Sequence, residues 1–246
     1  MSAVCLSPRE AAADFDPTGR TRKPKPKPNP NPGRPPAPKP KPTDDGAAAG
    51  KGPSSDALIA RYTAIVLSQP SAPFPLQRLS QLYRERDGNI KKLVEEFEKR
   101  AVTPGAEAWA AKVALAGIYK QDGRPDDAIK MYQSAIAEKP NDPSAILALA
   151  NLESERGDKT NARTTYESAL KLLKAGPDWD QTTRTLLGLC LDLKDYEAAK
   201  KYHDSLVKAS QGSLFVKAEL GREFLTRGLY DKAEAEFREL VKAAAG

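Results

Sequence analysis

The feature that most constrains the fold is an internal period of 34 residues. Six residues between Leu115 and Ala135 recur, with unchanged identity, between Leu149 and Ala169. The pairs in this register are Leu115 and Leu149, Ala116 and Ala150, Gly123 and Gly157, Ala128 and Ala162, Tyr132 and Tyr166, and Ala135 and Ala169. A second set, Tyr196, Ala199, His203 and Leu206, recurs at the same interval as Tyr230, Ala233, Phe237 and Leu240. A fixed period of this length predicts a stack of similar units, each of which buries its apolar face against its neighbours.

Each unit is predicted to be a pair of antiparallel helices. Apolar residues recur at helical spacing from residue 56 onward, and no strand pattern is present in the sequence. Gly123 is expected to end a first helix, where a positive φ is cheap only for glycine. Pro125 is expected to open the second helix, where its missing amide hydrogen costs nothing. Small residues such as Ala128 then stand where the two helices cross closely, and Tyr132 fills the space beside them.

This pattern resembles the tetratricopeptide repeat, a family of 34-residue helix–turn–helix units. The resemblance implies an all-α, right-handed solenoid of stacked helix pairs. Lys112 departs from the family pattern, because it stands where the family often has tryptophan. The residues that carry the resemblance are Leu115, Ala116, Tyr119, Gly123, Ala128, Tyr132, Pro140, Ala162, Tyr166, Gly188, Ala199, Gly221, Ala233 and Phe237.

The resemblance extends over residues 56–246 and divides them into about four and a half units. The expected units are a half repeat at 56–70, followed by 73–104, 109–142, 143–176, 180–211 and 214–246. The unit at 73–104 departs from the pattern because Leu93 occupies a position where a small residue is expected. The unit at 180–211 follows a three-residue insertion, and its turn, Lys194-Asp195, is expected to be one residue short and has no glycine.

Residues 1–55 form a separate predicted region, a disordered Pro/Lys-rich tail that holds 13 of the 21 prolines. Its net charge is 10 − 5 = +5, whereas residues 56–246 carry 29 − 28 = +1. Alternating Lys-Pro favours an extended polyproline II conformation, and is similar to the stiff spacers of some bacterial envelope proteins. The tail is interpreted as a spacer, with two alternatives: a basic strap that binds a polyanion, nucleic acid or membrane surface, and a ligand for a groove that reads proline-rich peptides. Nucleic acid is the weaker of these, because the tail has only Phe15 for stacking on bases.

The resemblance implies a function as a scaffold or adaptor that binds a peptide or helix of another protein in the concave face of the stack. The first helix of each unit lines that face in the family. By helical phase, the expected contacts are Gln81, Arg84, Val113, Lys120, Leu147, Asn151, Asp192, Phe215 and Arg222. Asn151 and Arg222 are expected to hold a peptide backbone or a carboxylate, because both side chains carry suitable hydrogen-bonding groups.

The last helix is followed by no polar capping helix in this sequence, although repeat arrays usually need one. Three alternatives are open: the end packs on a copy of itself, a partner covers it, or the chain is a piece of a longer array. A homodimer through the C-terminal unit is therefore one expectation.

Composition argues against an enzyme. His203 is the only histidine and falls at the packing position of Tyr132 and Tyr166, so no catalytic triad can be assembled around it. Phosphate-binding and dinucleotide-binding glycine motifs are missing from the sequence, and Cys5 and Cys190 are too few for a zinc site. No cofactor and no metal are expected. No apolar stretch is long enough to span a membrane and no signal peptide is visible, so the expected location is the cytoplasm, or the envelope if the true start lies upstream.

Overall fold

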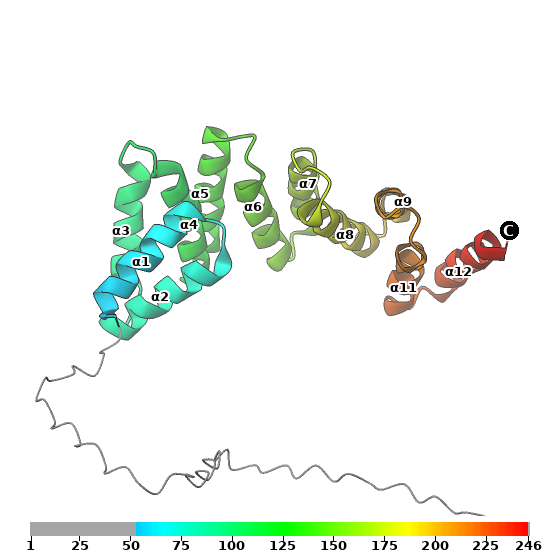
Figure 1. The fold of residues 1–246 in the computed structure, drawn as a ribbon, viewed down its shortest axis with the longest axis horizontal. Helices are drawn as coiled ribbons and strands as arrows, with labels where there is room; N and C mark the ends of the chain where they lie inside the picture. Colours follow the sequence, from blue (N-terminus) through cyan, green and yellow to red (C-terminus); the bar gives the residue numbers. More distant parts are fainter. Residues whose placement is uncertain (1–52, 246) are drawn as a thin grey trace, which may run out of the picture. The chain divides into compact units, whose positions relative to one another are not determined.

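The computed structural model describes residues 53–245, and every regular element in that range is a helix (Figure 1). The predicted tail, residues 1–55, lies outside the described residues except at its end, where Ser54 caps the first helix by accepting a hydrogen bond from the Ala57 amide. The helices are α1 (Ser55–Ser68), α2 (Pro73–Asp87), α3 (Lys91–Val102), α4 (Ala108–Gln121), α5 (Pro125–Glu138), α6 (Pro143–Glu155), α7 (Lys159–Leu170), α8 (Pro177–Asp192), α9 (Tyr196–Ala209), α10 (Leu214–Lys217), α11 (Glu219–Thr226) and α12 (Tyr230–Ala245).

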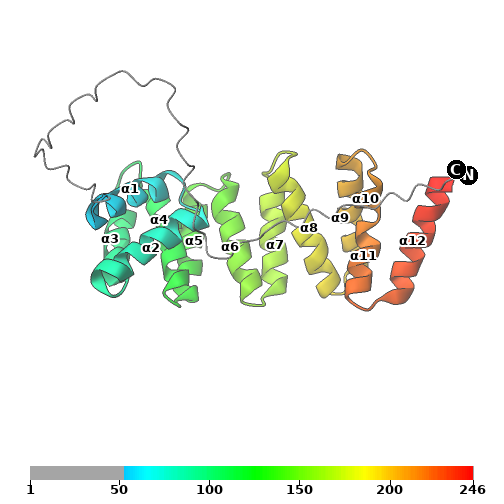
Figure 2. The ribbon, with the colours of Figure 1, turned by 60° about the horizontal axis from the view of Figure 1, so that its bottom comes forward.

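From α4 onward the helices form successive antiparallel pairs that stand side by side in chain order (Figure 2). The pairs are α4 with α5, α6 with α7, α8 with α9, and α11 with α12. At the crossing of each pair an alanine of the repeat pattern is completely or almost completely buried: Ala128, Ala162, Ala199 and Ala233. The predicted all-α solenoid of stacked helix pairs is therefore confirmed for the described residues.

The core is distributed along the stack. Buried residues form three clusters, the first spanning α1 to α6, the second centred on α6 to α8, and the third spanning α8 to α12. Such an arrangement is expected for a repeat protein, because each unit contacts only its neighbours. Within residues 53–245, no helix combines the length and the apolar character needed to cross a bilayer.

Glycine in a left-handed conformation ends the first helix of most pairs. Gly123, Gly157 and Gly228 have φ values of 76°, 79° and 70°. In each case the next residue donates its amide hydrogen to a carbonyl five residues earlier, as Asp158 does to Glu153 at 3.0 Å. This geometry closes the helix and starts the turn into its partner.

The pair of α8 and α9 has the same turn without the glycine. Lys194 adopts φ 61°, and Asp195 donates to the Cys190 carbonyl at 2.8 Å, which reproduces the hydrogen bond of the other turns. Lys194 also lies 34 residues before Gly228, in register with it. The expectation of a turn one residue short was therefore wrong: the turn has full length, and lysine occupies the glycine position.

Replacing Lys194 by glycine is expected to raise the free energy of unfolding by about 0.5–1 kcal/mol. A side chain in the left-handed region costs roughly 1–2 kcal/mol, from which the larger entropy that glycine loses on folding must be subtracted. Urea denaturation measures the change. Lys171→Gly is the matched control, because Lys171 ends α7 with an ordinary right-handed conformation and should lose stability on the same replacement. Equal losses in both variants would contradict the prediction.

The N-terminal end differs from the predicted half repeat at 56–70 and full unit at 73–104. α2 packs mainly against α1, and α3 packs mainly against α4, whereas α2 and α3 share few contacts. Leu93, which is completely buried, stands where the other pairs have alanine. Leucine is too large for the close helix approach that alanine allows. The main packing partner of α2 is α1, which is therefore not a half unit alone.

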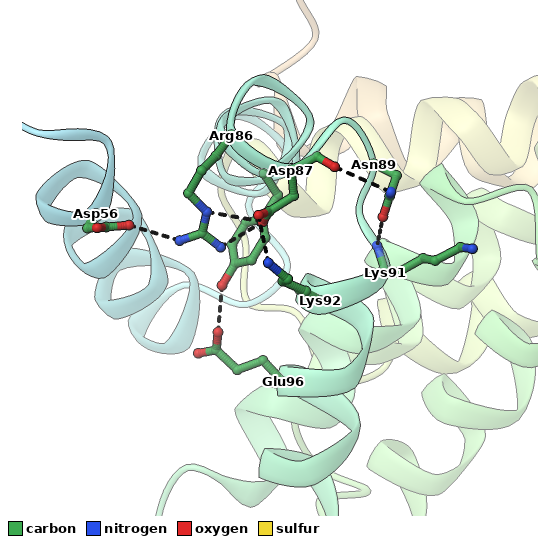
Figure 3. Close-up of polar contacts among 8 residues, drawn as sticks. Asp56, Arg86, Asp87, Asn89, Lys91, Lys92 and Glu96 are labelled. Carbon is green, nitrogen blue, oxygen red and sulfur yellow. Dashed lines mark hydrogen bonds and ion pairs between the residues drawn. The ribbon is translucent and has the colours of Figure 1, made fainter.

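Polar contacts join α2 to α1 and to α3 (Figure 3). The Tyr83 hydroxyl on α2 donates to Glu96 Oε2 on α3 at 2.5 Å. Burial and the hydrogen bond to Glu96 raise the pKa of Tyr83 well above its ordinary value, so the hydroxyl keeps its proton at neutral pH. Arg86 Nη1 lies 3.0 Å from Asp56 Oδ1 and thereby ties α2 to α1 (Figure 3).

Candidate partner-binding groove

A surface groove lies over α2, α4 and α6, beside the loop that precedes α2. Its walls combine apolar, amide and charged side chains, and Tyr132 of α5 reaches it from behind. The lining consists of Pro70, Ser71, Ala72, Pro73, Leu76, Gln77, Gly117, Lys120, Gln121, Tyr132, Ala148, Asn151 and Glu155. It is the described surface hollow that best matches the face on which the sequence placed partner contacts.

Gly117 shapes the floor of the groove. A Cβ atom at this position would lie 2.4 Å from Leu76 Cδ2 and 3.8 Å from the Tyr132 hydroxyl. The missing side chain lets Leu76 of α2 lie against the α4 backbone, and both Leu76 and Tyr132 are nearly buried. The floor is therefore apolar and closely packed.

The wall contributed by α4 and α6 is polar. Lys120 Nζ lies 2.7 Å from the carboxylate of Glu155, which joins the two helices across the groove. The Tyr166 hydroxyl donates to Asn151 Oδ1. Within residues 53–245, the Asn151 side-chain nitrogen has no hydrogen-bond partner, so its two N–H groups remain available to a ligand.

Burial keeps the tyrosine at the back of this wall protonated. The pKa of Tyr166 is raised to about 12, first by burial and then by the nearby charges of Glu155 and Glu153. A tyrosine that is neutral across the physiological range can donate only one hydrogen. Because that hydrogen goes to the Asn151 carbonyl oxygen, it fixes which way the Asn151 amide points.

At this end of the stack, some of the predicted partner contacts line the groove and others lie outside it. Lys120 and Asn151 line the groove together, beside Gln77 and Gln121. Gln81 and Arg84 are exposed further along α2, outside the lining, and Gln81 donates to Glu85 at 2.8 Å.

Two other predicted contacts are partly or wholly covered. Leu147 is half-buried and packs against the second core cluster. Val113 is completely buried, so its assignment as a partner contact was wrong. The physical reason is that α4 is enclosed by neighbouring helices on nearly every side, with all residues from Val113 to Tyr119 buried.

The remaining predicted contacts lie further along the stack. Asp192 bridges two neighbours, with Oδ2 2.8 Å from Lys159 and Oδ1 3.0 Å from Arg227. Burial raises the pKa of Asp192, but the hydrogen bonds from Lys159 and Arg227 outweigh it and leave the pKa below its ordinary value. These contacts make Asp192 a tie between units.

Phe215 and Arg222 form a small exposed patch of their own. The Arg222 guanidinium carbon lies 4.4 Å from the centre of the Phe215 ring, and Nη2 donates to the Phe215 carbonyl at 2.8 Å. Arg222 is thus occupied within α10 and α11, two units away from Asn151. Nothing in the structure joins these two residues in one site.

Sequence reasoning missed several members of the groove. The loop from Pro70 to Pro73 belongs to it because α1 folds back beside α2, which a regular repeat would not predict. Glu155 was also missed, although its place four residues after Asn151 on α6 puts both on one helical face.

Comparison with known families decides what these helix pairs are. Two models of the tetratricopeptide repeat match the chain, one over residues 91–143 and the other over residues 119–189. Residues 91–189 therefore consist of tetratricopeptide repeats. The resemblance based on Leu115, Gly123, Tyr132 and their repeats is thereby confirmed.

Similar proteins are distant. The chain is 26% identical over 163 residues to the cellulose synthase operon protein C of Pseudomonas fluorescens (strain SBW25). This match covers 64% of this chain but only 12% of that protein. The crystal structure of BtubC from P. vanneervenii has a TM-score of 0.52 and 16% identity, covering 78% of this chain and 88% of that one. The crystal structure of a tetratricopeptide repeat protein from Parabacteroides merdae has a TM-score of 0.49 and 20% identity, and the match covers 79% of this chain and 68% of that one. The BtubC likeness supports the shared fold alone.

One signature residue of the repeat formed by α8 and α9 needs correction. Because Lys194 fixes the register, Leu187 rather than Gly188 stands at the position of Ala150 and Gly221. Leu187 is 1% exposed, as that packing position requires. In the last repeat the same position is Gly221, where a Cβ would come within 2.7 Å of the Phe237 ring.

Proposed function

We propose that the protein is a non-enzymatic scaffold that binds an extended segment of a partner protein in the groove over α2, α4 and α6. The observation that carries the proposal is the Asn151 amide, whose oxygen accepts from Tyr166 and whose N–H groups have no partner within the described structure, in a groove that Leu76 and Gly117 also line. A positioned donor beside apolar side chains is suited to recognition of a peptide backbone.

The chemistry of the wall favours a peptide backbone over a charged side chain. Gln77, Gln121 and Asn151 carry carboxamides, which both donate and accept hydrogen bonds and therefore match the N–H and C=O groups of an extended chain. The one cation of the groove, Lys120, is neutralised by Glu155. With no excess charge, the groove supports recognition of main chain and small apolar side chains.

Family membership supports the general part of this proposal, because tetratricopeptide repeats bind other proteins. The Pseudomonas relative is named for a cellulose synthase operon, but the chain spans 12% of its length. That likeness therefore supports repeat-mediated binding and does not identify the partner.

The alternative proposal is that the basic tail binds a polyanion, nucleic acid or membrane surface. It rests on the net charge of residues 1–55, which lie almost entirely outside the described structure. Binding of this kind weakens steeply with salt and does not depend on the groove.

The test uses the full chain as bait, followed by affinity measurement with the purified captured partner. Asn151→Ala with Lys120→Ala is expected to weaken binding about tenfold or more, because each lost hydrogen bond costs on the order of 1 kcal/mol. Asn141→Ala with Lys130→Ala is the matched control, since it removes the same two residue types from exposed positions outside the groove. A partner that tolerates the groove pair as well as the control pair contradicts the groove proposal, and salt-sensitive binding by residues 1–55 alone supports the tail.

A further inference from the structure

The groove over α2, α4 and α6 offers a ligand no main-chain edge to pair with. Every regular element within residues 53–245 is a helix, and the main chains of α2, α4 and α6 form their hydrogen bonds within each helix. The loop beside the groove begins and ends with proline, at Pro70 and Pro73, and proline has no amide hydrogen. A ligand cannot be bound here by strand addition, because that mode needs an exposed sheet edge.

Side chains must therefore supply the hydrogen bonds, and two of them present free donors. The Tyr132 hydroxyl has no hydrogen-bond partner within residues 53–245, and it is open to solvent although the ring behind it is almost completely buried. Burial, and then the charge of Glu155, raise the pKa of Tyr132 to about 12, so the hydroxyl is protonated at neutral pH and can donate. Asn151, whose oxygen accepts from Tyr166, adds the two N–H groups of its amide.

Gly117 leaves the Tyr132 hydroxyl uncovered. A Cβ atom at Gly117 would lie 3.8 Å from that hydroxyl, so a side chain there would cover part of it. Leu76 and Ala148 line the same groove from α2 and α6. A ligand therefore meets hydroxyl and amide donors set among apolar side chains, where an unpaired N–H group of the ligand would be costly.

A polyproline II helix matches this combination better than an α-helix does. The carbonyl groups of an α-helical ligand are bonded within the ligand, so they would leave the Tyr132 and Asn151 donors without partners. A polyproline II helix makes no internal hydrogen bonds, and all its carbonyl groups are free to accept. Each proline also lacks the N–H group that an apolar lining could not pair. Gln77 and Gln121 can accept from the N–H groups of the residues between prolines.

The size and charge of the groove fit a short, uncharged stretch of this kind. Packed helices lie about 8–10 Å apart, so a ligand that crosses from α2 over α4 to α6 covers roughly 20 Å. At about 3.1 Å per residue, roughly six residues of polyproline II span that length. Lys120 is paired with Glu155 at 2.7 Å, so the groove offers no net charge to a strongly basic or acidic segment.

We propose that the partner segment bound in this groove is a proline-rich stretch of about six residues in the polyproline II conformation, with its carbonyl groups on Tyr132 and Asn151. The inference rests on the proposed function, because it names the chemical class of the segment that the groove binds. Tyr132 is then a specificity-determining residue, since its hydroxyl selects ligands whose carbonyl groups are not already bonded. A low entropy cost favours such a ligand further, because a proline-rich stretch is extended before it binds.

The first experiment titrates the chain with a capped, uncharged peptide of three Gln-Pro-Pro triplets, and with a peptide in which alanine replaces every proline. The chain is used at full length with alanine at the ten prolines from Pro24 to Pro42, because these would otherwise offer the same chemistry within the same molecule. Calorimetry is expected to show binding of the proline peptide. The alanine peptide should bind at least about tenfold more weakly, because it loses more conformational entropy and leaves N–H groups unpaired. Equal affinity for the two peptides, or no binding of either, overturns the proposal.

The second experiment removes one donor from the groove. Tyr132→Phe deletes only the hydroxyl and is expected to weaken binding of the proline peptide about fivefold, the effect of one lost hydrogen bond. Because this hydroxyl has no partner within the described residues, its loss should leave the stability of the chain unchanged. Tyr230→Phe is the matched control, since Tyr230 is exposed and lies outside the groove. Peptide binding that is equally strong in the two variants contradicts the role of Tyr132 and the proposal with it.

A competition measurement separates this inference from the proposed function. The proline peptide should displace the captured partner from the chain, because both occupy the same groove. A partner that needs Asn151 and Lys120 but is not displaced by the peptide leaves groove binding standing and overturns the polyproline II inference. A partner that tolerates Asn151→Ala with Lys120→Ala overturns both proposals.

Discussion

Replacing Phe97 by alanine is expected to lower the free energy of unfolding by about 3–5 kcal/mol. Phe97 lies on α3, is completely buried, and is the largest of the fully buried side chains in the described residues. It belongs to the core cluster that joins α1 to α6. Because α2 and α3 share few contacts, this cluster is what holds the N-terminal helices together, and the cavity cannot be closed by a neighbouring pair.

The loss is expected to be regional. In a repeat protein each unit is stabilised by its neighbours, so damage at one end propagates only as far as the shared contacts. Hydrogen exchange should show faster exchange in α2, α3 and α4 in Phe97→Ala, with little change in α9 to α12, whose buried residues form a separate cluster. Val102→Ala, at an exposed position on the same helix, should leave exchange unchanged. Uniformly faster exchange along the whole chain would contradict a distributed core.

The helix pairs were predictable because their determinants are local. A glycine in the turn and an alanine at the crossing, as at Gly157 and Ala162, recur at fixed spacing and act within one unit. The positive φ of Lys194 was not predicted, because the surrounding turn sets its conformation and lysine carries no signal for a positive φ. Once the turn was taken as short, the register of Gly188 was misplaced by one residue.

The groove was less predictable, because it depends on how units meet. Helical phase assigns a face correctly only when a helix has one buried side. α6 satisfies that condition, and its Asn151 lines the groove. α4 does not, since α3, α5, α1 and α2 all contact it, and Val113 was therefore assigned to a surface that does not exist.

The N-terminal arrangement shows the limit of pattern matching in another way. Leu93 was recognised as too large for its position, but the sequence did not reveal that α2 would turn to α1 instead. That outcome follows from a balance between two possible partners for α2. The converse substitution tests the effect of side-chain size: a leucine is placed where a regular helix pair has its buried alanine.

Replacing Ala128 by leucine is expected to lower the free energy of unfolding by about 1–3 kcal/mol. Ala128 is completely buried at the crossing of α4 and α5, 35 residues after Leu93 and at the equivalent place in its pair. The larger side chain can be accommodated only if the two helices separate. Ala137→Leu is the matched control, because Ala137 is exposed on the same helix and the same replacement there should change stability little.

Trp109 provides a measurement of the separation itself. Its Nε1 donates to the Ala135 carbonyl at 3.0 Å, so a tryptophan at the start of α4 is bonded to the backbone of α5. In a Trp179→Phe background, which leaves Trp109 as the only tryptophan of the chain, Ala128→Leu should shift the emission to longer wavelength as the ring loses this contact and meets water. If Ala128→Leu is as stable as Ala137→Leu and leaves the emission unchanged, alanine is not what holds these helices close. The size of Leu93 would then not explain why α2 and α3 stand apart.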